Sequence, residues 1–347
     1  MQNPRPVYCS PLLRPTPTTI PPGLREWLGG FLAGPPRGPR LRHNRVCLFA
    51  LGRIGDFILT LGALRLLIRE FGPDNCVLVV PAGLVPIVRG EFPSTRYIPL
   101  LHDASGLVKE MLPAWWRERP KFSPDHFEYR ICLSHQRGLY YELALSWIDA
   151  EKDVRLLPET YPTVPTEGLS TELLAHWRVA ETVLRRKVSR EEILPRFDSI
   201  TPANDGRLLV YPLSLDPSRS ISIGHVTEVL QQWRRRSAAP IVFGAGPPEQ
   251  FELERYANAA RQAGLDNVTV ELPAGIGGLL AHLARAGAVL AADSGAAHIA
   301  AALDKPLVLL MDTPIYGYAN PWQRSTRQQA FLNTVPLGAV AAALPAL

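Results

Sequence analysis

The hydrophobic pattern opens with a short apolar run, a tight turn and a helical stretch. Val46–Leu51 is continuously apolar, which is typical of a strand buried on both faces. The turn Gly52–Asp56 follows, and Phe57–Phe71 has a helical pattern that ends at Gly72-Pro73. Cys76–Val80 is the next strand-like run. The pattern predicts a right-handed βαβ unit at the start of the first domain.

The same alternation returns in the C-terminal half. The expected strands there are Leu208–Tyr211, Ile241–Gly244, Val268–Leu272, Ala288–Ala292 and Leu307–Met311, and the expected helices are Gly224–Arg236, Pro247–Gly264, Gly277–Ala286 and Gly295–Leu303. Between the two series, Tyr97–Leu101 and Tyr129–Leu133 are weaker strand candidates. Regular alternation predicts an α/β protein with two doubly wound, Rossmann-like parallel sheets, whose strands point their carboxyl ends into a shared cleft.

The pattern also divides the chain into four parts. Residues 1–41 are rich in proline and arginine, and we interpret them as an arm that is either weakly ordered or docks on a membrane or partner. Residues 42–200 form the first predicted domain and 201–330 the second. Residues 331–347 are a tail that could form a helix on the N-terminal domain.

Composition narrows the class of protein. Of 347 residues, 46% are hydrophobic and 20% are charged, which is typical of a folded globular chain. The net charge of +5 suits an anionic ligand or an anionic membrane surface. No apolar run reaches the roughly 18 residues of a membrane span, and the four cysteines form no C-x-x-C pair. These features predict a cytoplasmic protein with reduced thiols, either free or peripheral on the inner face of the cytoplasmic membrane.

The turn Gly52–Asp56 lies where open α/β sheets bind ligands, between a strand and the following helix. Asp56 suits a helix N-cap carboxylate, and it equally suits a general base facing the cleft. A nicotinamide site would need Gly-x-Gly-x-x-Gly and an acid at the end of the second strand. The turn is Gly-x-x-Gly instead, and the second strand ends Val80-Pro81-Ala82-Gly83, which argues against such a site.

Three further turns could bind a ligand. Asp293–His298 opens a helix, whose N-terminal amides attract phosphate, while Asp293 itself suits a sugar hydroxyl or backbone amides. Arg219, in Ser214–Ser220, could pair with a diphosphate or simply be solvated. Gly244–Glu249 is another strand-to-helix turn, for which ordinary turn chemistry is the alternative. A lone histidine such as His298 is often only a packing residue.

Several chemistries are absent from the sequence. No Asp-x-Asp follows a strand, and no His, Cys and carboxylate cluster has metal-ligand spacing, so we expect no metal or other cofactor. There is no Walker loop and no Ser-His-Asp arrangement. Basic residues are not interleaved with aromatic ones, so nucleic acid is not an expected partner.

Two segments carry a family resemblance. LFALGRIGDFILTLGALRLL and AVLAADSGAAHIAAALDKPLVLL resemble the N- and C-terminal signatures of the heptosyltransferases, glycosyltransferase family 9. SLDPSRSISIGHVTEVL and VFGAGPPEQ lie between them in the family's order, and the resemblance covers about residues 45–325. It implies a GT-B fold and inverting, metal-independent transfer from ADP-heptose to a lipopolysaccharide-core acceptor.

The resemblance also implies roles for individual residues. By this resemblance, Asp56 stands at the position of the family's catalytic base, and Gly52, Arg53 and Gly55 belong to the acceptor-side loop around it. The implied donor-site residues are Ser214, Arg219, Gly244, Glu249, Asp293, Ser294, Gly295, Ala296 and His298.

The sequence departs from the family at three places, and these leave alternatives open. Arg219 stands where the family usually has lysine, Ile221 where many members have tryptophan, and residues 312–318 differ from the usual glycine-rich turn. Transfer from another nucleotide sugar, for capsule, O-antigen or natural-product glycosylation, is one alternative. A non-catalytic nucleotide-sugar-binding protein and a sugar-nucleotide epimerase are the others. The expected partners are a nucleotide sugar and a glycan or lipid-linked glycan acceptor.

Overall fold

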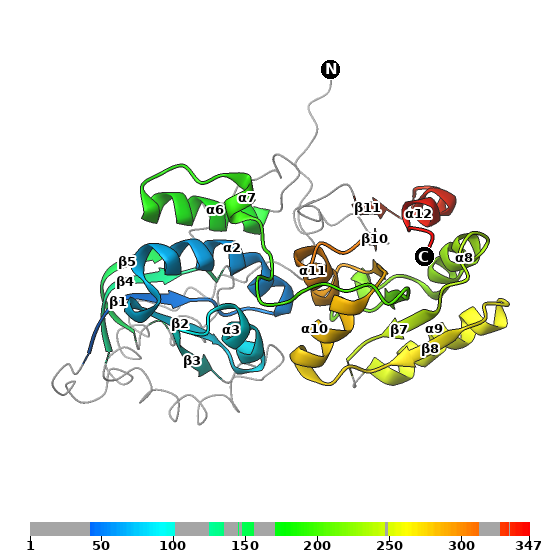
Figure 1. Ribbon diagram of the computed structural model, residues 1–347, viewed down its shortest axis with the longest axis horizontal. Helices are drawn as coiled ribbons and strands as arrows, with labels where there is room; N and C mark the ends of the chain where they lie inside the picture. The colour runs from blue at the N-terminus through cyan, green and yellow to red at the C-terminus, as the bar shows by residue number, and fades with distance from the viewer. Residues whose placement is uncertain are drawn as a thin grey trace, which may run out of the picture.

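The computed structural model describes residues 42–100, 125–134, 145, 148–155, 171–246, 249–311, 327–332 and 334–347. The proline-rich arm of residues 1–41 and the turn of residues 312–318 lie outside these ranges. Two sheets lie side by side, each flanked by helices (Figure 1). Every strand pairing in both sheets is parallel, which confirms the predicted α/β class.

The first sheet has the order β3-β2-β1-β4-β5. Its strands are β1 (Arg42–Phe49), β2 (Cys76–Pro81), β3 (Arg96–Leu100), β4 (Asp125–Cys132) and β5 (Asp149–Arg155). Its helices are α2 (Ile54–Phe71), α3 (Val85–Glu91), α6 (Thr171–Leu184) and α7 (Arg190–Ile193), with the 3-10 turns η2 (Pro73–Asn75) and η3 (Ala82–Leu84). The central strands are apolar because helices and loops cover both of their faces.

The second sheet has the order β11-β10-β9-β6-β7-β8. Its strands are β6 (Leu208–Tyr211), β7 (Ile241–Gly244), β8 (Val268–Glu271), β9 (Ala288–Ala291), β10 (Leu307–Met311) and β11 (Gln328–Leu332). Its helices are α8 (Ile223–Arg234), α9 (Gln250–Gln262), α10 (Gly275–Arg285), α11 (Gly295–Ala302) and α12 (Leu337–Ala343), with the 3-10 turn η6 (Pro217–Arg219). The five strands expected in this half match β6–β10 to within one residue.

One hydrophobic cluster runs through both domains. It joins the α2 side of the first sheet to α10, α11 and one face of the second sheet. The other face of the second sheet packs against α8, α9 and α12 in a separate cluster. The two domains are therefore in direct apolar contact, with α11 next to α2 at their junction (Figure 1).

The segment that leads from the first domain to the second is fixed near both of its ends. On the first domain, the Glu91 carboxylate accepts hydrogen bonds from the backbone N–H groups of Asp198 and Ser199, each at 2.9 Å, and pairs with Arg65 at 3.1 Å. On the second domain, Ala203 N–H donates to the Ala284 carbonyl at 2.8 Å. Three residues, 200–202, lie between these two anchors.

A buried lysine strengthens the second anchor. The ammonium of Lys305, which is 4% exposed, donates to the backbone carbonyls of Ala203 and Ala286. Burial lowers the pKa of Lys305, and the charge of Asp205 opposes that shift. The lysine thus ties the linker to the start of β9.

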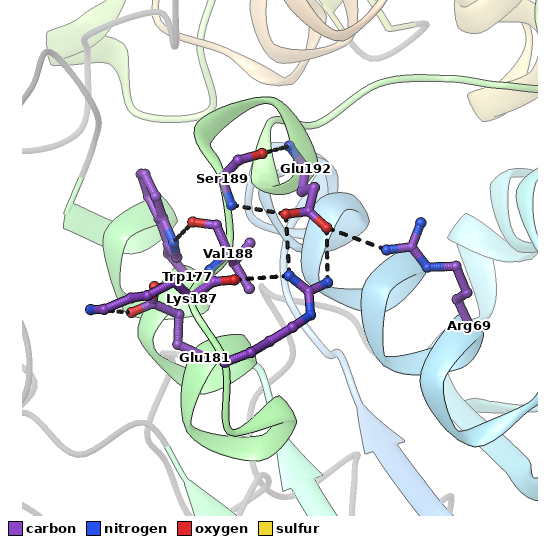
Figure 2. A network of polar contacts seen from close by, with 8 residues as sticks. Arg69, Trp177, Glu181, Lys187, Val188, Ser189 and Glu192 are labelled. Carbon is purple, nitrogen blue, oxygen red and sulfur yellow. Dashed lines mark hydrogen bonds and ion pairs between the residues drawn. The ribbon is translucent and has the colours of Figure 1, made fainter.

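A polar network fixes the α6–α7 corner before the linker (Figure 2). Ser189 and Glu192 form a capping box at the start of α7. The Glu192 carboxylate also contacts Arg186 at 2.8 Å and Arg69, on α2, at 3.4 Å. The hydrogen bonds from Arg186 and Ser189 lower the pKa of Glu192 to about 2. The corner is therefore fastened to α2 by charge as well as by packing.

The C-terminal tail differs from its expected place. Helix α12 packs on α8 in the second domain, where the Trp233 indole N–H donates to the Pro345 carbonyl at 2.8 Å. The guanidinium of Arg236 donates to the carbonyls of Ala341 and Leu344. These bonds satisfy carbonyls at the end of α12, so the tail belongs to the C-terminal domain and not to the N-terminal one. In the described part of the chain, no helix has the length and apolarity needed to cross a membrane.

Candidate active site at the domain junction

The turn after β1 holds the candidate base, Asp56. Helix α2 begins at Ile54, earlier than the hydrophobic pattern predicts, with Arg53 as its extended N-cap residue. Asp56 is therefore the third residue of the helix and not its N-cap. Its Oδ2 accepts a hydrogen bond from Arg53 N–H at 3.0 Å. A Cβ atom on Gly52 would come within 2.8 Å of Asp56 Cβ, so glycine leaves room for the half-buried carboxylate to fold back over the turn.

The two signature turns are in contact with each other across the domain junction. A Cβ atom on Gly55 would lie 2.6 Å from Cδ2 of His298, which is in α11. One on Gly295 would lie 2.9 Å from Cβ of Ile54. Such distances are too short for packed carbon atoms, so both glycines are needed for the first turns of α2 and α11 to meet. The Asp56 turn therefore lies beside the His298 segment.

Asp293 is a buried carboxylate that is paired with a cation. It is 3% exposed, and its Oδ2 lies 3.2 Å from Nη1 of Arg219. Its Oδ1 lies 3.7 Å from Nε2 of His298. The sequence suggested a sugar hydroxyl or backbone amides as its partners, but a carboxylate this deeply buried needs a nearby positive charge. Arg219 supplies that charge and is four-fifths buried, so it is not a solvated loop residue.

His298 is held in its neutral form. Burial lowers the pKa of His298, the carboxylates of Asp293 and Asp56 oppose this, and the charge of Arg219 adds to it. With a pKa below its usual value, the imidazole is uncharged at pH 7. Since Asp56 and Asp293 come from different domains, the two halves of the site share one electrostatic environment.

The loop after β6 folds onto the start of α11. Ser214 Oγ donates to the backbone carbonyl of Asp293 at 2.9 Å, and Ser214 N–H donates to Ser220 Oγ at 3.0 Å. These two bonds close the loop and fasten it to the Asp293 turn. Ser214 therefore supports the site by shaping it.

Asp216 extends the charged surface of this loop. The hydrogen bonds from Ser218 are the main cause of a lowered pKa for Asp216, and the charges of Arg219 and Arg53 act in the same direction. Arg53 is exposed and belongs to the first domain. Its influence on Asp216 means that the two domains present opposite charges to each other at this point.

The start of α11 carries an unsatisfied hydroxyl. Ser294 is the N-cap residue, yet its side chain makes no capping bond, and its buried Oγ has no hydrogen-bond partner among the described residues. Native proteins rarely leave such a group unpaired. Ala296 is buried, at 7% exposed, and lies in the first turn of α11. The unpaired hydroxyl and the first-turn amides together suit an anion.

Glu249 and Gly244 are accounted for by their own neighbours. Glu249 Oε2 accepts a hydrogen bond from Gly246 N–H at 3.0 Å, within its own turn. Gly244 is buried, and a Cβ atom there would lie 2.4 Å from Cζ of Tyr211. Glycine at this position therefore makes room for an aromatic ring. The part of either residue in donor binding stays a prediction.

A chain of polar side chains at the carboxyl ends of β6 and β8 was not predicted from the sequence. Tyr211 Oη lies 2.7 Å from His282 Nδ1, and Glu271 Oε2 lies 3.0 Å from His282 Nε2. Tyr211 and His282 are each 5% exposed. The only sequence signal was that Tyr211 and Glu271 stand at strand ends. No group of three or more His, Cys, Asp or Glu residues in the described ranges could hold a metal ion.

Comparison with known proteins gives a family for the second domain and a fold for the whole. Residues 182–334 match the model of glycosyltransferase family 9 (heptosyltransferase). The E. coli heptosyltransferase WaaC, solved with ADP, is 15% identical over 86% of this chain and 98% of its own, with a TM-score of 0.64. E. coli ADP-heptose LPS heptosyltransferase II is 14% identical over 86% and 97%, with a TM-score of 0.61.

A third solved structure gives the same picture. The family 9 glycosyltransferase from Veillonella parvula DSM 2008 is 14% identical over 84% of this chain and 88% of its own, with a TM-score of 0.61. No curated protein sequence matches the chain. At these identities the structures show the fold, and they confirm the predicted GT-B arrangement of two Rossmann-like domains.

Proposed function

We propose that the chain is a glycosyltransferase of family 9, the heptosyltransferases, and that its donor is ADP-heptose; the match of residues 182–334 to the family model and the shared fold support this. The acceptor would be a hydroxyl of the lipopolysaccharide core or a similar glycan, and the transfer would invert the anomeric carbon without a metal ion. The observation that carries the proposal is the contact of Gly55 with His298. It supports one reaction site that is shared by an acceptor-side base and a donor-side anion site. Because such an acceptor is lipid-linked, the enzyme would work at the cytoplasmic face of the inner membrane.

The donor site is argued from unsatisfied groups around α11. The Oγ of Ser294 and the Nε of Arg219 are buried without a hydrogen-bond partner among the described residues. Both would be satisfied by the oxygens of a diphosphate, and the dipole of α11 attracts the same charge. The similar structures were solved with ADP and with ADP-2-deoxy-2-fluoro heptose, which supports an adenine nucleotide.

The chemistry needs one base and one stabilised leaving group. Asp56 would take the proton of the acceptor hydroxyl while that oxygen attacks the anomeric carbon from the face opposite the diphosphate. The bond from the anomeric carbon to the phosphate oxygen breaks, and its electron pair stays on the departing diphosphate. Arg219, Ser294 and the first-turn amides of α11 would stabilise that charge, an effect worth several kcal/mol in a site that excludes water.

The pairing of Arg219 with Asp293 sets how the diphosphate would be held. Asp293 Oδ2 already lies 3.2 Å from Nη1 of the guanidinium, and Asp216 Oδ2 lies 3.8 Å from its Nε. A diphosphate would therefore bind to the remaining N–H groups, while Asp293 keeps the guanidinium oriented. Neutral His298 would stay beside Asp293 as a hydrogen-bonding group and would add no positive charge.

The donor is tested by thermal unfolding with a panel of nucleotide sugars: ADP-heptose, ADP-glucose, UDP-glucose and GDP-mannose. At a hundred times its dissociation constant, the true donor adds about 2.7 kcal/mol to the free energy of unfolding. We expect ADP-heptose to give the largest shift in midpoint. A larger shift with UDP-glucose or GDP-mannose would refute the donor assignment but not the enzyme class. The anomeric configuration of the product, read by NMR, tests inversion.

A further inference from the structure

The last residues of three neighbouring strands form a row at the carboxyl edge of the second sheet. Tyr211 ends β6, Gly244 ends β7 and Glu271 ends β8. The register pairs Val210 with Phe243 and Gly244 with Glu271, so the three strand ends are level with one another. The carboxyl edge of such a sheet is where α/β proteins bind their ligands.

A side-chain bridge crosses this row. The Tyr211 ring extends over β7, because a Cβ atom on Gly244 would lie 2.4 Å from its Cζ and 2.7 Å from its Oη. Its hydroxyl reaches Nδ1 of His282, on α10, at 2.7 Å. The other nitrogen of His282 lies 3.0 Å from Glu271 Oε2, although this contact is not aligned as a hydrogen bond. Arg207 holds the second oxygen of Glu271 at 2.8 Å.

The two central groups of the bridge are uncharged at pH 7. Burial raises the pKa of the Tyr211 hydroxyl, and the charge of Glu271 adds to the rise. Burial lowers the pKa of His282, and Glu271 opposes that shift. Because the Glu271 carboxylate lies beside Nε2, we place the proton of the neutral ring on Nε2, and the Tyr211 hydroxyl then donates to Nδ1. Such a bridge fixes the orientation of the side chains that it joins and the distances between them.

Each end of the bridge leads into a loop around the candidate donor site. Tyr211 is followed by the loop that contains Ser214 and Arg219. Its carbonyl also accepts a hydrogen bond at 2.9 Å from Ala292 N–H, the residue directly before Asp293. Glu271 leads into the start of α10. One bridge of side chains therefore connects the loops that follow β6 and β8, and the Tyr211 carbonyl links it to the turn after β9.

We propose that Tyr211, His282 and Glu271 are positioning residues that hold these loops in the arrangement that binds a nucleoside diphosphate. This inference rests on the proposed function, because it concerns the same donor site. A polar pair kept only for folding could be replaced by apolar side chains of similar shape at little cost. Here the bonds run between the ends of strands, which is where a change of geometry would reach the ligand.

The test separates nucleotide affinity from stability. Tyr211→Phe removes only the hydroxyl and leaves a ring above Gly244. The control is Trp233→Phe, which also removes one buried side-chain hydrogen bond, the 2.8 Å contact of Trp233 with Pro345 beside α12. ADP affinity is measured by calorimetry at a temperature where each variant is fully folded, and stability is measured by urea unfolding.

We expect Tyr211→Phe to weaken ADP binding about three- to tenfold, within the range for one neutral hydrogen bond. Trp233→Phe should lose stability and keep wild-type affinity. His282→Asn retains an acceptor near the place of Nδ1, so it should bind ADP more tightly than His282→Leu. This order would not follow from lost stability alone.

Two results would overturn the proposal, and they differ from each other. If Tyr211→Phe binds ADP as tightly as the wild type while unfolding at lower urea, the bridge is only structural and the proposed function still stands. All affinities are compared with whichever of ADP, UDP and GDP the wild type binds. If the wild type binds none of the three, the proposed function fails and this inference fails with it.

Discussion

Replacing Gly55 with alanine perturbs the contact that joins the two halves of the candidate active site. The added methyl group would lie 2.6 Å from Cδ2 of His298, about 0.8 Å inside the 3.4 Å at which contacts become ordinary. The imidazole has little room to retreat, because its Nε2 already faces Asp293 at 3.7 Å. Overpacking of this kind costs about 1–3 kcal/mol, and a displacement of about 1 Å can lower turnover about 100-fold. We expect both losses, with turnover reduced about 10- to 100-fold.

A matched glycine isolates the clash from the change in helix propensity. Gly224 is the second residue of α8, as Gly55 is of α2, and a Cβ atom there would meet nothing within 4 Å. Both Gly→Ala changes gain about 1 kcal/mol of helix propensity, so the difference between them measures the steric contact. Removing the obstructing ring with His298→Ala should restore most of the stability of the Gly55→Ala protein, with a coupling of about 1 kcal/mol or more, but not its turnover.

The measurements are urea unfolding and the initial rate of donor consumption with acceptor. If Gly55→Ala is as stable and as active as Gly224→Ala, the two first turns do not meet as described and the shared site is refuted. If the double variant loses the sum of the two single losses, the clash is not with His298.

Four further predictions concern the charged groups. Asp56→Asn should lower turnover about 100-fold or more while ADP affinity is unchanged, and wild-type turnover would remove Asp56 from the mechanism. Arg219→Ala should weaken ADP binding about 10- to 150-fold, or about 1.5–3 kcal/mol. Arg219→Lys should recover only part of this loss if the contact with the diphosphate is bidentate. If titration shows that Arg219→Ala binds ADP as tightly as the wild type, Arg219 has only a structural role. EDTA should leave the transfer rate intact, and strict dependence on Mg²⁺ or Mn²⁺ would contradict the proposed chemistry. Because the pKa of Glu192 falls from 4.5 to about 2 in the folded protein, its contribution to stability is complete above about pH 4.5 and is lost as the pH falls toward 2. In Glu192→Gln, unfolding midpoints should therefore depend less on pH across that range, and an unchanged profile would contradict the network of Figure 2.

The central strands were predictable because burial on both faces leaves an unbroken apolar run. Leu208–Tyr211 and Leu307–Met311 are fully buried and were placed to the residue. The edge strand β5 gave no such signal. It carries the exposed residues Glu151, Lys152 and Asp153 in a row, so it has no apolar run to mark it as a strand.

The sequence predicted which turns form the candidate site, but not which residues contact one another within it. Glycines after strands marked Gly52–Asp56 and Asp293–His298 as ligand-binding turns, and the structure brings those turns together. That Gly55 and Gly295 serve the contact between helices could not be read from either turn alone, since each glycine is explained by the other domain. The bond between Tyr211 and His282 spans 71 residues, and polar side chains that pair over such a separation leave no periodic pattern.

The short linker restricts how the two domains can move. Glu91 fixes residues 198 and 199 to the first domain, and Ala203 is bonded to the second. The four peptide units from Ser199 to Ala203 span at most about 14 Å, so these two anchor points cannot lie farther apart than that. Pro202 has a fixed φ and limits the conformations of Thr201, which leaves few free torsions in the linker. Any change in the angle between the two domains would therefore be a rotation about residues 200–202, and it would separate His298 from Gly55.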